Sequence, residues 1–398
     1  MGWRISYFCI MAVLLWGCAD DSYLGAMGES YGVGGQYIPV MVSVGEASGN
    51  LVKSGSDEVP ENWSNRQICV YAFARGGGIS YSSTSSTAPY ECLMDGTLAD
   101  PANPGGRKAV LESNDSYARW EDDKELFYPF GKYRKMSYDF FAYYLDGLKV
   151  SVRDYMRDEN SVRINVEIDG TQDLMSSKAV LTEKQMGEFS PEEQALVSEN
   201  AYGYYTAQRN VVPTFYMKHH LARLEFEFVP GYVREEKKTI TVHRIEVESR
   251  ARAYFTVAAR DADSLGLAFE DKKKVLTLTE KGGLPMEDDA YVLETLPSYD
   301  TKVKPVKIGG SILVAPDEEY RAYAVMSEVR EDGTVVASRA RTEVLISFAP
   351  EVFEAGNQYK VRLVIYGATQ VTLSVEMQKW NEGGDIDMDM DKEMENKY

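Results

Sequence analysis

The chain has 398 residues, a length that suits two hydrophobic cores better than one. Hydrophobic residues make up 44% of it and charged residues 26%, so it can bury large cores and remain soluble. Its formal net charge is −19, which excludes the basic surface that binding to nucleic acid requires and fits a protein kept away from anionic membrane surfaces.

The N-terminus has the pattern of a secretion signal. Arg4 supplies a positive charge, and the apolar run that follows over 5–15 is too short to span a bilayer. The sequence LWGC at 15–18 resembles a lipobox, the motif in which the cysteine is acylated and becomes the new N-terminus. The acidic residues directly after it resemble the surface-export signal of some Gram-negative lipoproteins. We therefore expect residues 1–17 to be removed and Cys18 to carry a lipid anchor in the outer membrane, at the cell surface.

Residues 18–35 are rich in glycine and are expected to form a flexible tether. A β-strand is expected over 37–44, and further short strand-like runs follow, with turn signals between them. These runs lie at 68–74, 90–94, 126–128, 138–145, 162–168 and 221–228. One short helix is expected over 190–200, because Ser190 can cap it and Pro191 suits its first position. Together they predict an N-terminal β-sandwich domain over 36–232.

A second series of strands begins after Pro230-Gly231 and a charged segment, where the domain boundary is expected. Its strand-like runs lie at 239–249, 254–259, 275–279, 291–296, 321–329, 344–348, 359–366 and 371–380. They predict a C-terminal β-sandwich domain over 233–382. The fold class expected is thus all-β, with two β-sandwich domains in tandem and one short helix in the N-terminal half.

Residues 383–398 form an acidic, methionine-rich tail. Alternating aspartates from Asp385 to Asp391 suggest calcium, but Met390 stands where the EF-hand loop needs glycine. The tail is therefore expected to be disordered and solvated, without a bound metal.

Two of the four cysteines remain once the signal and the lipid are accounted for. Cys9 lies in the signal, and Cys18 is the expected lipid site, which leaves Cys69 and Cys92. In an oxidising compartment these two can form a disulfide if their strands are neighbours. They can equally be two unpaired small residues of the core.

No motif in the sequence indicates catalysis or a cofactor. His219 and His220 are adjacent in a strand and point to opposite faces, and His243 is the third histidine, so no zinc site is expected. We interpret His220 as a packed, hydrogen-bonded structural residue. The pairs Asp122-Asp123 and Asp288-Asp289 are interpreted as solvated loop charges. The protein is not expected to be an enzyme, and no cofactor is expected.

Five motifs, in order along the chain, resemble those of the fimbrillin family of type V pilus proteins. They are ICVYAF at 68–73, YP at 128–129 with YDFFAYY at 138–144, QDLM at 172–175, HHLARL at 219–224, and FEAGNQY at 353–359 followed by Trp380. Together with the lipoprotein signal they extend over residues 1–384.

The resemblance implies that the two sandwiches are transthyretin-like and that the partners are other fimbrial subunits. In many members a protease removes an N-terminal segment after a basic residue, and the freed groove accepts a strand from a neighbouring subunit. Lys53 matches the cleavage position here, with Arg66 as the alternative. The strand that leaves or fills the groove would place four alternate residues on one face, namely Ile38, Val40, Val42 and Val44.

The function expected is that of a fimbrillin-like surface lipoprotein, a pilus component or adhesin that assembles by β-strand donation. Lysine in place of arginine at the cleavage position, and the acidic tail, favour an accessory, tip or anchor subunit over a stalk subunit. The alternative is a non-polymerising surface lipoprotein that binds a glycan or protein ligand, from a host or a bacterial surface, through exposed tyrosines.

Overall fold

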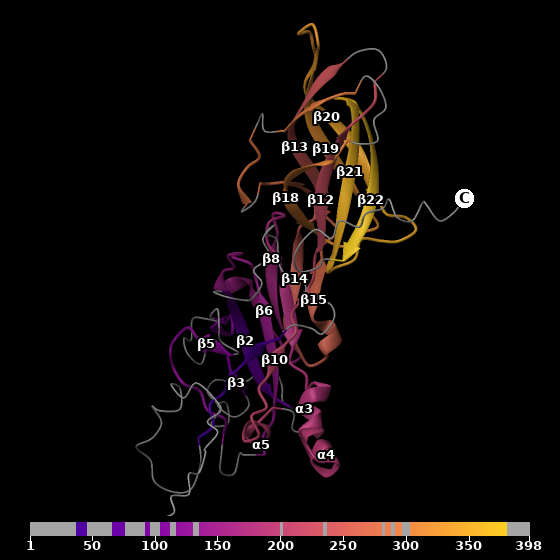
Figure 1. Cartoon of the computed structure of the whole chain (residues 1–398). Helices are drawn as coiled ribbons and strands as arrows, with labels where there is room; N and C mark the ends of the chain where they lie inside the picture. Colours follow the sequence, from indigo (N-terminus) through magenta and orange to yellow (C-terminus); the bar gives the residue numbers. More distant parts are fainter. Residues whose placement is uncertain are drawn as a thin grey trace, which may run out of the picture. The chain divides into compact units, whose positions relative to one another are not determined.

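The computed structural model describes most of the chain from Tyr37 onward. The described ranges are 37–45, 66–75, 92–95, 104–111, 117–129, 135–199, 202–233, 237–280, 283–287, 291–296 and 303–379. Residues from Tyr37 onward belong to one compact unit, whose elements are labelled in Figure 1. Cys18, Lys53, Asp288, Asp289 and the tail at 383–398 lie outside the described residues. Within those residues, no helix has the length and apolar character needed to cross a membrane.

A seven-stranded sheet is the centre of the N-terminal part. Its order is β11-β9-β6-β2-β4-β5, and β3 also pairs with β2. The strands are β2 (Gln67–Ala74), β3 (Cys92–Met94), β4 (Arg107–Leu111), β5 (Ala118–Trp120), β6 (Tyr138–Tyr144), β9 (Met175–Lys178) and β11 (Lys218–His219). A separate parallel pair joins β1 (Ser43–Val44) to β10 (Thr214–Phe215).

A four-stranded sheet, in the order β15-β14-β8-β7, completes the N-terminal sandwich. Its strands are β7 (Tyr155–Arg157), β8 (Ser161–Glu167), β14 (Arg252–Ala259) and β15 (Gly266–Phe269). The Phe255 ring meets the Tyr143 ring of β6 edge-on, with 6.3 Å between centroids. Contacts of this kind close the core between the two sheets.

Two further sheets form the C-terminal sandwich, and Figure 1 shows their strands as one group. The first has the order β18-β12-β21-β22, with β12 (Ala222–Pro230), β18 (Val306–Val314), β21 (Asn357–Gly367) and β22 (Gln370–Lys379). The second has the order β16-β13-β19-β20, with β13 (Lys238–Arg250), β16 (Lys273–Thr277), β19 (Glu319–Arg330) and β20 (Val335–Ser347), and with β17 (Tyr291–Glu294) also paired to β13. The described residues thus form an all-β fold, as expected.

Strand pairing crosses the boundary expected at residues 232 and 233. β12, expected in the N-terminal domain, pairs with β18 and β21 of the C-terminal sandwich. β14, expected in the C-terminal domain, pairs with β8 of the N-terminal sandwich. The chain passes between the two at Ala251, which is fully buried and whose carbonyl accepts a hydrogen bond from the Ile168 amide. Alternation marks a strand but carries no information on its partner, which is why this exchange was not predicted.

Several strands were not expected from the sequence, and β18 shows the reason. It contains Gly309-Gly310, and Gly309 has φ +59° in a bulge opposite β12, where the register shifts between Glu225 and Phe226. The glycines and the bulge interrupt the alternation that marks a strand. The short strands β4, β5, β7, β9 and β15 were also not predicted.

Three short α-helices occur among the described residues, where one was expected. They are α3 (Glu183–Gly187), α4 (Pro191–Glu199) and α5 (Tyr204–Ala207), and two 3₁₀ turns, η3 (Val152–Asp154) and η4 (Ala262–Ser264), are also present. α4 is the predicted helix: Ser190 Oγ accepts a bond from the Glu193 amide at 3.3 Å, and the Glu193 carboxylate accepts one from the Ser190 amide at 3.1 Å. α3 and α5 are too short to show helical periodicity in the sequence.

Candidate functional site: the N-terminal strand and its groove

The segment 37–45 fills a groove in the N-terminal sandwich. Val40 is 1% exposed and Val42 is fully buried, and Ile38 and Val44 pack against the same hydrophobic cluster. The cluster also contains Trp120 and Phe215. The four alternate side chains named from the sequence therefore lie on one face, toward the core.

The first half of the segment pairs with the chain around residues 118–128. The Val40 amide donates to the Leu126 carbonyl at 2.7 Å, and the Tyr128 amide donates to the Ile38 carbonyl at 3.0 Å. The Ala118 amide donates to the Val42 carbonyl at 2.9 Å. Pro39 lacks an amide hydrogen and makes an antiparallel bridge with Phe127.

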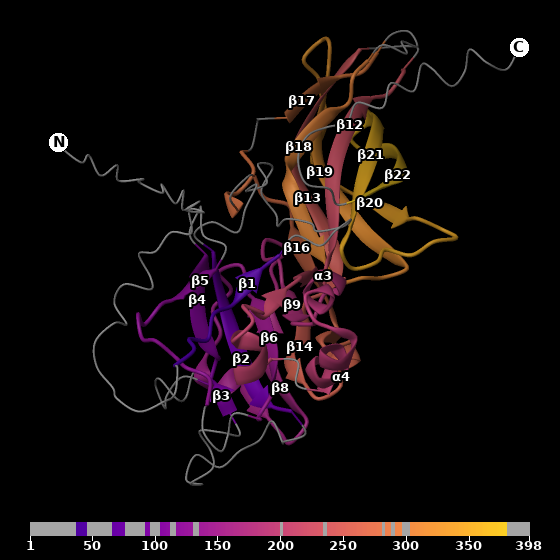
Figure 2. The ribbon, with the colours of Figure 1, turned by 60° about the horizontal axis from the view of Figure 1, so that its bottom comes forward.

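The second half of the segment pairs on the opposite side. The Ser43 amide donates to the Pro213 carbonyl at 2.9 Å, and the Gly45 amide donates to the Phe215 carbonyl at 3.0 Å, beside the parallel pair of β1 and β10. Figure 2 shows β1 in the N-terminal sandwich. The segment is therefore inserted between two parts of the chain that lie about 90 residues apart in sequence, and it is not an extension of the seven-stranded sheet.

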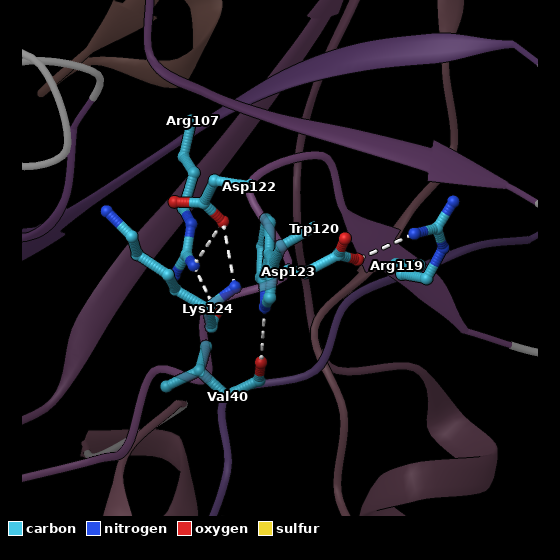
Figure 3. A network of polar contacts seen from close by, with 7 residues as sticks. All are labelled: Val40, Arg107, Arg119, Trp120, Asp122, Asp123 and Lys124. Carbon is cyan, nitrogen blue, oxygen red and sulfur yellow. Dashed lines mark hydrogen bonds and ion pairs between the residues drawn. The ribbon is translucent and has the colours of Figure 1, made fainter.

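A polar cluster around Trp120 holds the segment in register (Figure 3). The Trp120 indole donates from Nε1 to the Val40 carbonyl at 3.2 Å. The Arg107 guanidinium lies over the indole ring at 4.6 Å from its centroid, and it bonds Asp122 Oδ1 at 2.8 Å and the Lys124 carbonyl. Both bonds come from Arg107 Nη2, so they hold the guanidinium against the ring face, and the position of the ring sets the direction of the indole N–H.

Asp122 and Asp123 are exposed loop charges, as expected, and both are also ion-paired. Asp122 pairs with Arg107, and Asp123, with φ +51°, pairs with Arg119 at 2.6 Å. Burial raises the pKa of Asp122, but the hydrogen bonds from Arg107 and from the Lys124 amide lower it more, so the pKa lies below its ordinary value. The carboxylate therefore stays charged and keeps Arg107 in place.

Arg66, the alternative cleavage position, is held at the start of β2. Its guanidinium donates to Tyr144 Oη at 3.2 Å and lies over the Tyr144 ring at 5.4 Å. Its carbonyl accepts a bond from the Leu111 amide at 3.2 Å. A protease must bind the chain extended and free, so these contacts oppose cleavage at Arg66.

Neither Cys69 nor Cys92 forms a disulfide in the structure. Cys92 is opposite Phe73 in the β2–β3 pair, and Cys69 lies four residues along β2 from Phe73. At about 3.3 Å per residue, Cys69 lies about 13 Å along β2 from the position opposite Cys92. A disulfide allows a Cα separation of only about 7 Å. Of the two alternatives that the sequence left open, the structure adopts the one without a disulfide between these residues.

The histidines lie at structural positions. His220 Nε2 is 2.8 Å from Ser176 Oγ, and its ring meets Phe255 edge-on at 5.5 Å. His219 Nδ1 is 2.6 Å from the buried Asp173 carboxylate, and His243 Nε2 is 2.8 Å from Ser327 Oγ. In the described ranges, no group of three or more His, Cys, Asp or Glu side chains is placed to hold a metal ion.

The sequence indicated the strand and a groove for it, but not the residues that line the groove. Trp120, Arg107 and Phe215 carried no motif, and Trp120 lies 80 residues from the carbonyl that it bonds. The one local signal is the sequence RWEDD at 119–123, which places an aromatic ring beside charges of both signs.

Of the three comparisons with known proteins, only the one with solved structures found similar proteins. No family model and no curated protein matches the chain. A protein assigned to cell adhesion from Bacteroides uniformis has a TM-score of 0.44 and 13% identity, over 87% of this chain and 98% of that chain. A fimbrial protein from Bacteroides vulgatus has a TM-score of 0.43 and 12% identity, over 86% of this chain and 100% of that chain.

The fimbrial anchor protein Mfa2 from Porphyromonas gingivalis has a TM-score of 0.30 and 11% identity, over 86% of this chain and 98% of that chain. These three solved structures are described as cell adhesion and fimbrial proteins.

Proposed function

We propose that this chain is a fimbrillin-like cell-surface lipoprotein that assembles with other fimbrial subunits by exchanging the strand at 37–45. It acts as an accessory, tip or anchor subunit of a pilus, or as an adhesin. The observation that supports the proposal is the insertion of this strand, with alternate side chains in the core and backbone bonds to two separate parts of the chain.

Strand exchange is favoured because an empty groove is unstable. Burial of a valine side chain stabilises by about 1.5–3 kcal/mol, so Val40 and Val42 together contribute about 3–6 kcal/mol. Loss of the strand also leaves the Leu126 carbonyl and the Phe215 carbonyl without their partners. An apolar groove edged by free backbone groups is the acceptor that β-augmentation requires.

Strand exchange is tested on the full chain after one cut. A site for a sequence-specific protease replaces residues 51–56, around Lys53, and the cut protein is mixed with an excess of labelled peptide with the sequence of residues 36–46. We expect the peptide to replace the resident segment, which separates on size-exclusion chromatography. A cut protein that keeps both its segment and its melting temperature would contradict the proposal, and the uncut protein is the control.

The lipid anchor is tested separately. Cys18→Ala should release the protein from membranes, because no acyl chain can then be attached. Cys69→Ala is the matched control and should stay with the outer membrane fraction. Retention of the Cys18→Ala variant in that fraction would show that another feature anchors the protein.

A second candidate function, ligand binding by a surface tyrosine, is favoured by Tyr254. This side chain is 41% exposed on β14, and its cross-strand neighbours are Asn165 and the small Ala268, so the ring face is accessible beside a planar amide. Such a surface suits stacking on a sugar ring or a protein side chain. Tyr254→Ala should lower binding to a glycan array or to a cell surface at least tenfold, whereas Tyr232→Ala, a similarly exposed tyrosine, should not.

A further inference from the structure

We infer that the groove selects its strand by a steric gate at Gly45 and by the register set at Trp120, and that it therefore refuses strand β22 of this same chain. The strand that it accepts has four alternating apolar residues followed directly by glycine, which is the pattern of residues 38–45. This inference rests on the strand exchange proposed above.

The gate is a point of close approach at the end of the segment. A Cβ atom placed on Gly45 would lie 2.8 Å from Tyr216 Cε1 and 2.9 Å from Thr214 Cγ2. Contacts below 3.0 Å force one of the groups to move. Gly45 cannot withdraw, because its amide donates to the Phe215 carbonyl at 3.0 Å, between those two side chains. All the atoms that it meets belong to side chains, so a residue with a Cβ atom fits at this position only if the Tyr216 ring and the Thr214 methyl group move from their packed positions.

The register of the segment is set five residues earlier. Trp120 Nε1 donates to the Val40 carbonyl, and the Leu126 carbonyl accepts from the Val40 amide. Val42 has no exposed surface, so a shift by one residue would turn the apolar face outward and place Met41 and Ser43 in the core. The distance from the Trp120 contact to the gate is therefore fixed at five residues.

β22 is the strand of this chain best suited to leave its sheet. Among the described residues it is the last strand, and it lies at a sheet edge, where it pairs with β21 alone in that sheet. Val371, Leu373 and Val375 pack against the core cluster, which gives it the alternation that the groove needs.

No register of β22 satisfies the gate. With Val371 at the position of Ile38, the residue at the gate is Gln378. A shift forward by two residues puts Lys379 at a core position and Trp380 at the gate, and a shift back by two puts Thr369 in the core and Glu376 at the gate. In each case a bulky side chain meets Tyr216 and Thr214. A second copy of this chain is therefore a poor donor through β22.

The test uses the cut full-length protein and four unlabelled peptides that compete with the labelled peptide of residues 36–46. They are the same sequence unlabelled, its Gly45→Val variant, residues 369–379, and residues 369–379 with Gln378→Gly. We expect the Gly45→Val change to weaken competition at least tenfold and residues 369–379 to compete weakly. Gln378→Gly should restore part of the competition, because it removes the clash and leaves the apolar face unchanged.

The outcomes separate this inference from the proposal beneath it. If the unchanged peptide of residues 36–46 does not exchange, strand exchange itself fails. If that peptide exchanges but its Gly45→Val variant or residues 369–379 compete equally well, only the selection fails. The cut protein alone should also stay monomeric on size-exclusion chromatography. A ladder of oligomers that disappears when β22 and Trp380 are removed would show that the groove does accept β22 from a second copy. Tyr216→Ala in the groove should recover competition by the Gly45→Val peptide.

Discussion

Cys69 shows how burial suppresses the reactivity of a single side chain. Burial raises the pKa of its thiol to about 11, so almost none of it is thiolate at pH 8. Cys92 is fully buried. We expect neither thiol to react with iodoacetamide at pH 8 in the folded protein and both to react in guanidinium chloride, as mapped by mass spectrometry. The melting temperature should be equal with and without reductant, and a drop on reduction would reveal a disulfide.

His220 should make stability depend on pH. Its surroundings, mainly through burial, lower the pKa of the ring from 6.5 to about 4. As the pH falls from 7 toward 4, His220 takes up a proton in the unfolded chain but not in the folded protein. The contribution of neutral His220 to the free energy of unfolding is therefore complete above pH 6.5 and is lost between pH 6.5 and 4. The loss is at most about 3 kcal/mol.

The comparison is His220→Gln against the wild type, each followed by urea unfolding at pH 7 and pH 4.5. The variant should lose less stability on acidification than the wild type, because the carboxylates contribute equally to both. Parallel curves for His220→Gln and the wild type would show that the ring is not the titrating group.

At the scale of the element, the segment 37–45 should be stabilised by one face only. Val42→Ala removes two buried methyl groups and leaves a cavity, so the free energy of unfolding should fall by about 2 kcal/mol. Ser43→Ala, on the neighbouring position, should change it by less than about 0.5 kcal/mol. Urea unfolding measures both, and equal effects would show that the segment is not packed in the groove.

Helix α4 and strand β18 show what local sequence can and cannot predict about an element. α4 was predicted because its cap, its proline and its first-turn acids act within four residues. β18 was missed because Gly309-Gly310 and the bulge opposite β12 hide its alternation. Elements whose stabilising contacts are local can thus be predicted, and elements shaped by their partner cannot.

At the scale of the whole molecule, the two sandwiches are connected by exchanged strands. Residues 37–232, the N-terminal domain expected from the sequence, would lack β14 and β15 and would carry β12 without its partners β18 and β21. The side chains of Ile164 and Val166 would then lose their packing partner Phe255 in the core. We expect this fragment to lack cooperative unfolding and near-ultraviolet circular dichroism, whereas residues 37–398 should show both. A cooperative transition in the fragment would contradict this.

The sequence by itself determined the all-β class, the position of α4, the longer strands and the apolar face formed by Ile38, Val40, Val42 and Val44. Each of these depends on residues within a few positions of one another, because alternation and capping are local properties. The tertiary structure decided that β12 and β14 change sandwiches, that Cys69 and Cys92 stay apart, and that Trp120 and Phe215 line the groove. The strand exchanges and the groove join residues about 80 to 170 positions apart, and their register follows from the summed packing of whole sheets, which no local pattern records.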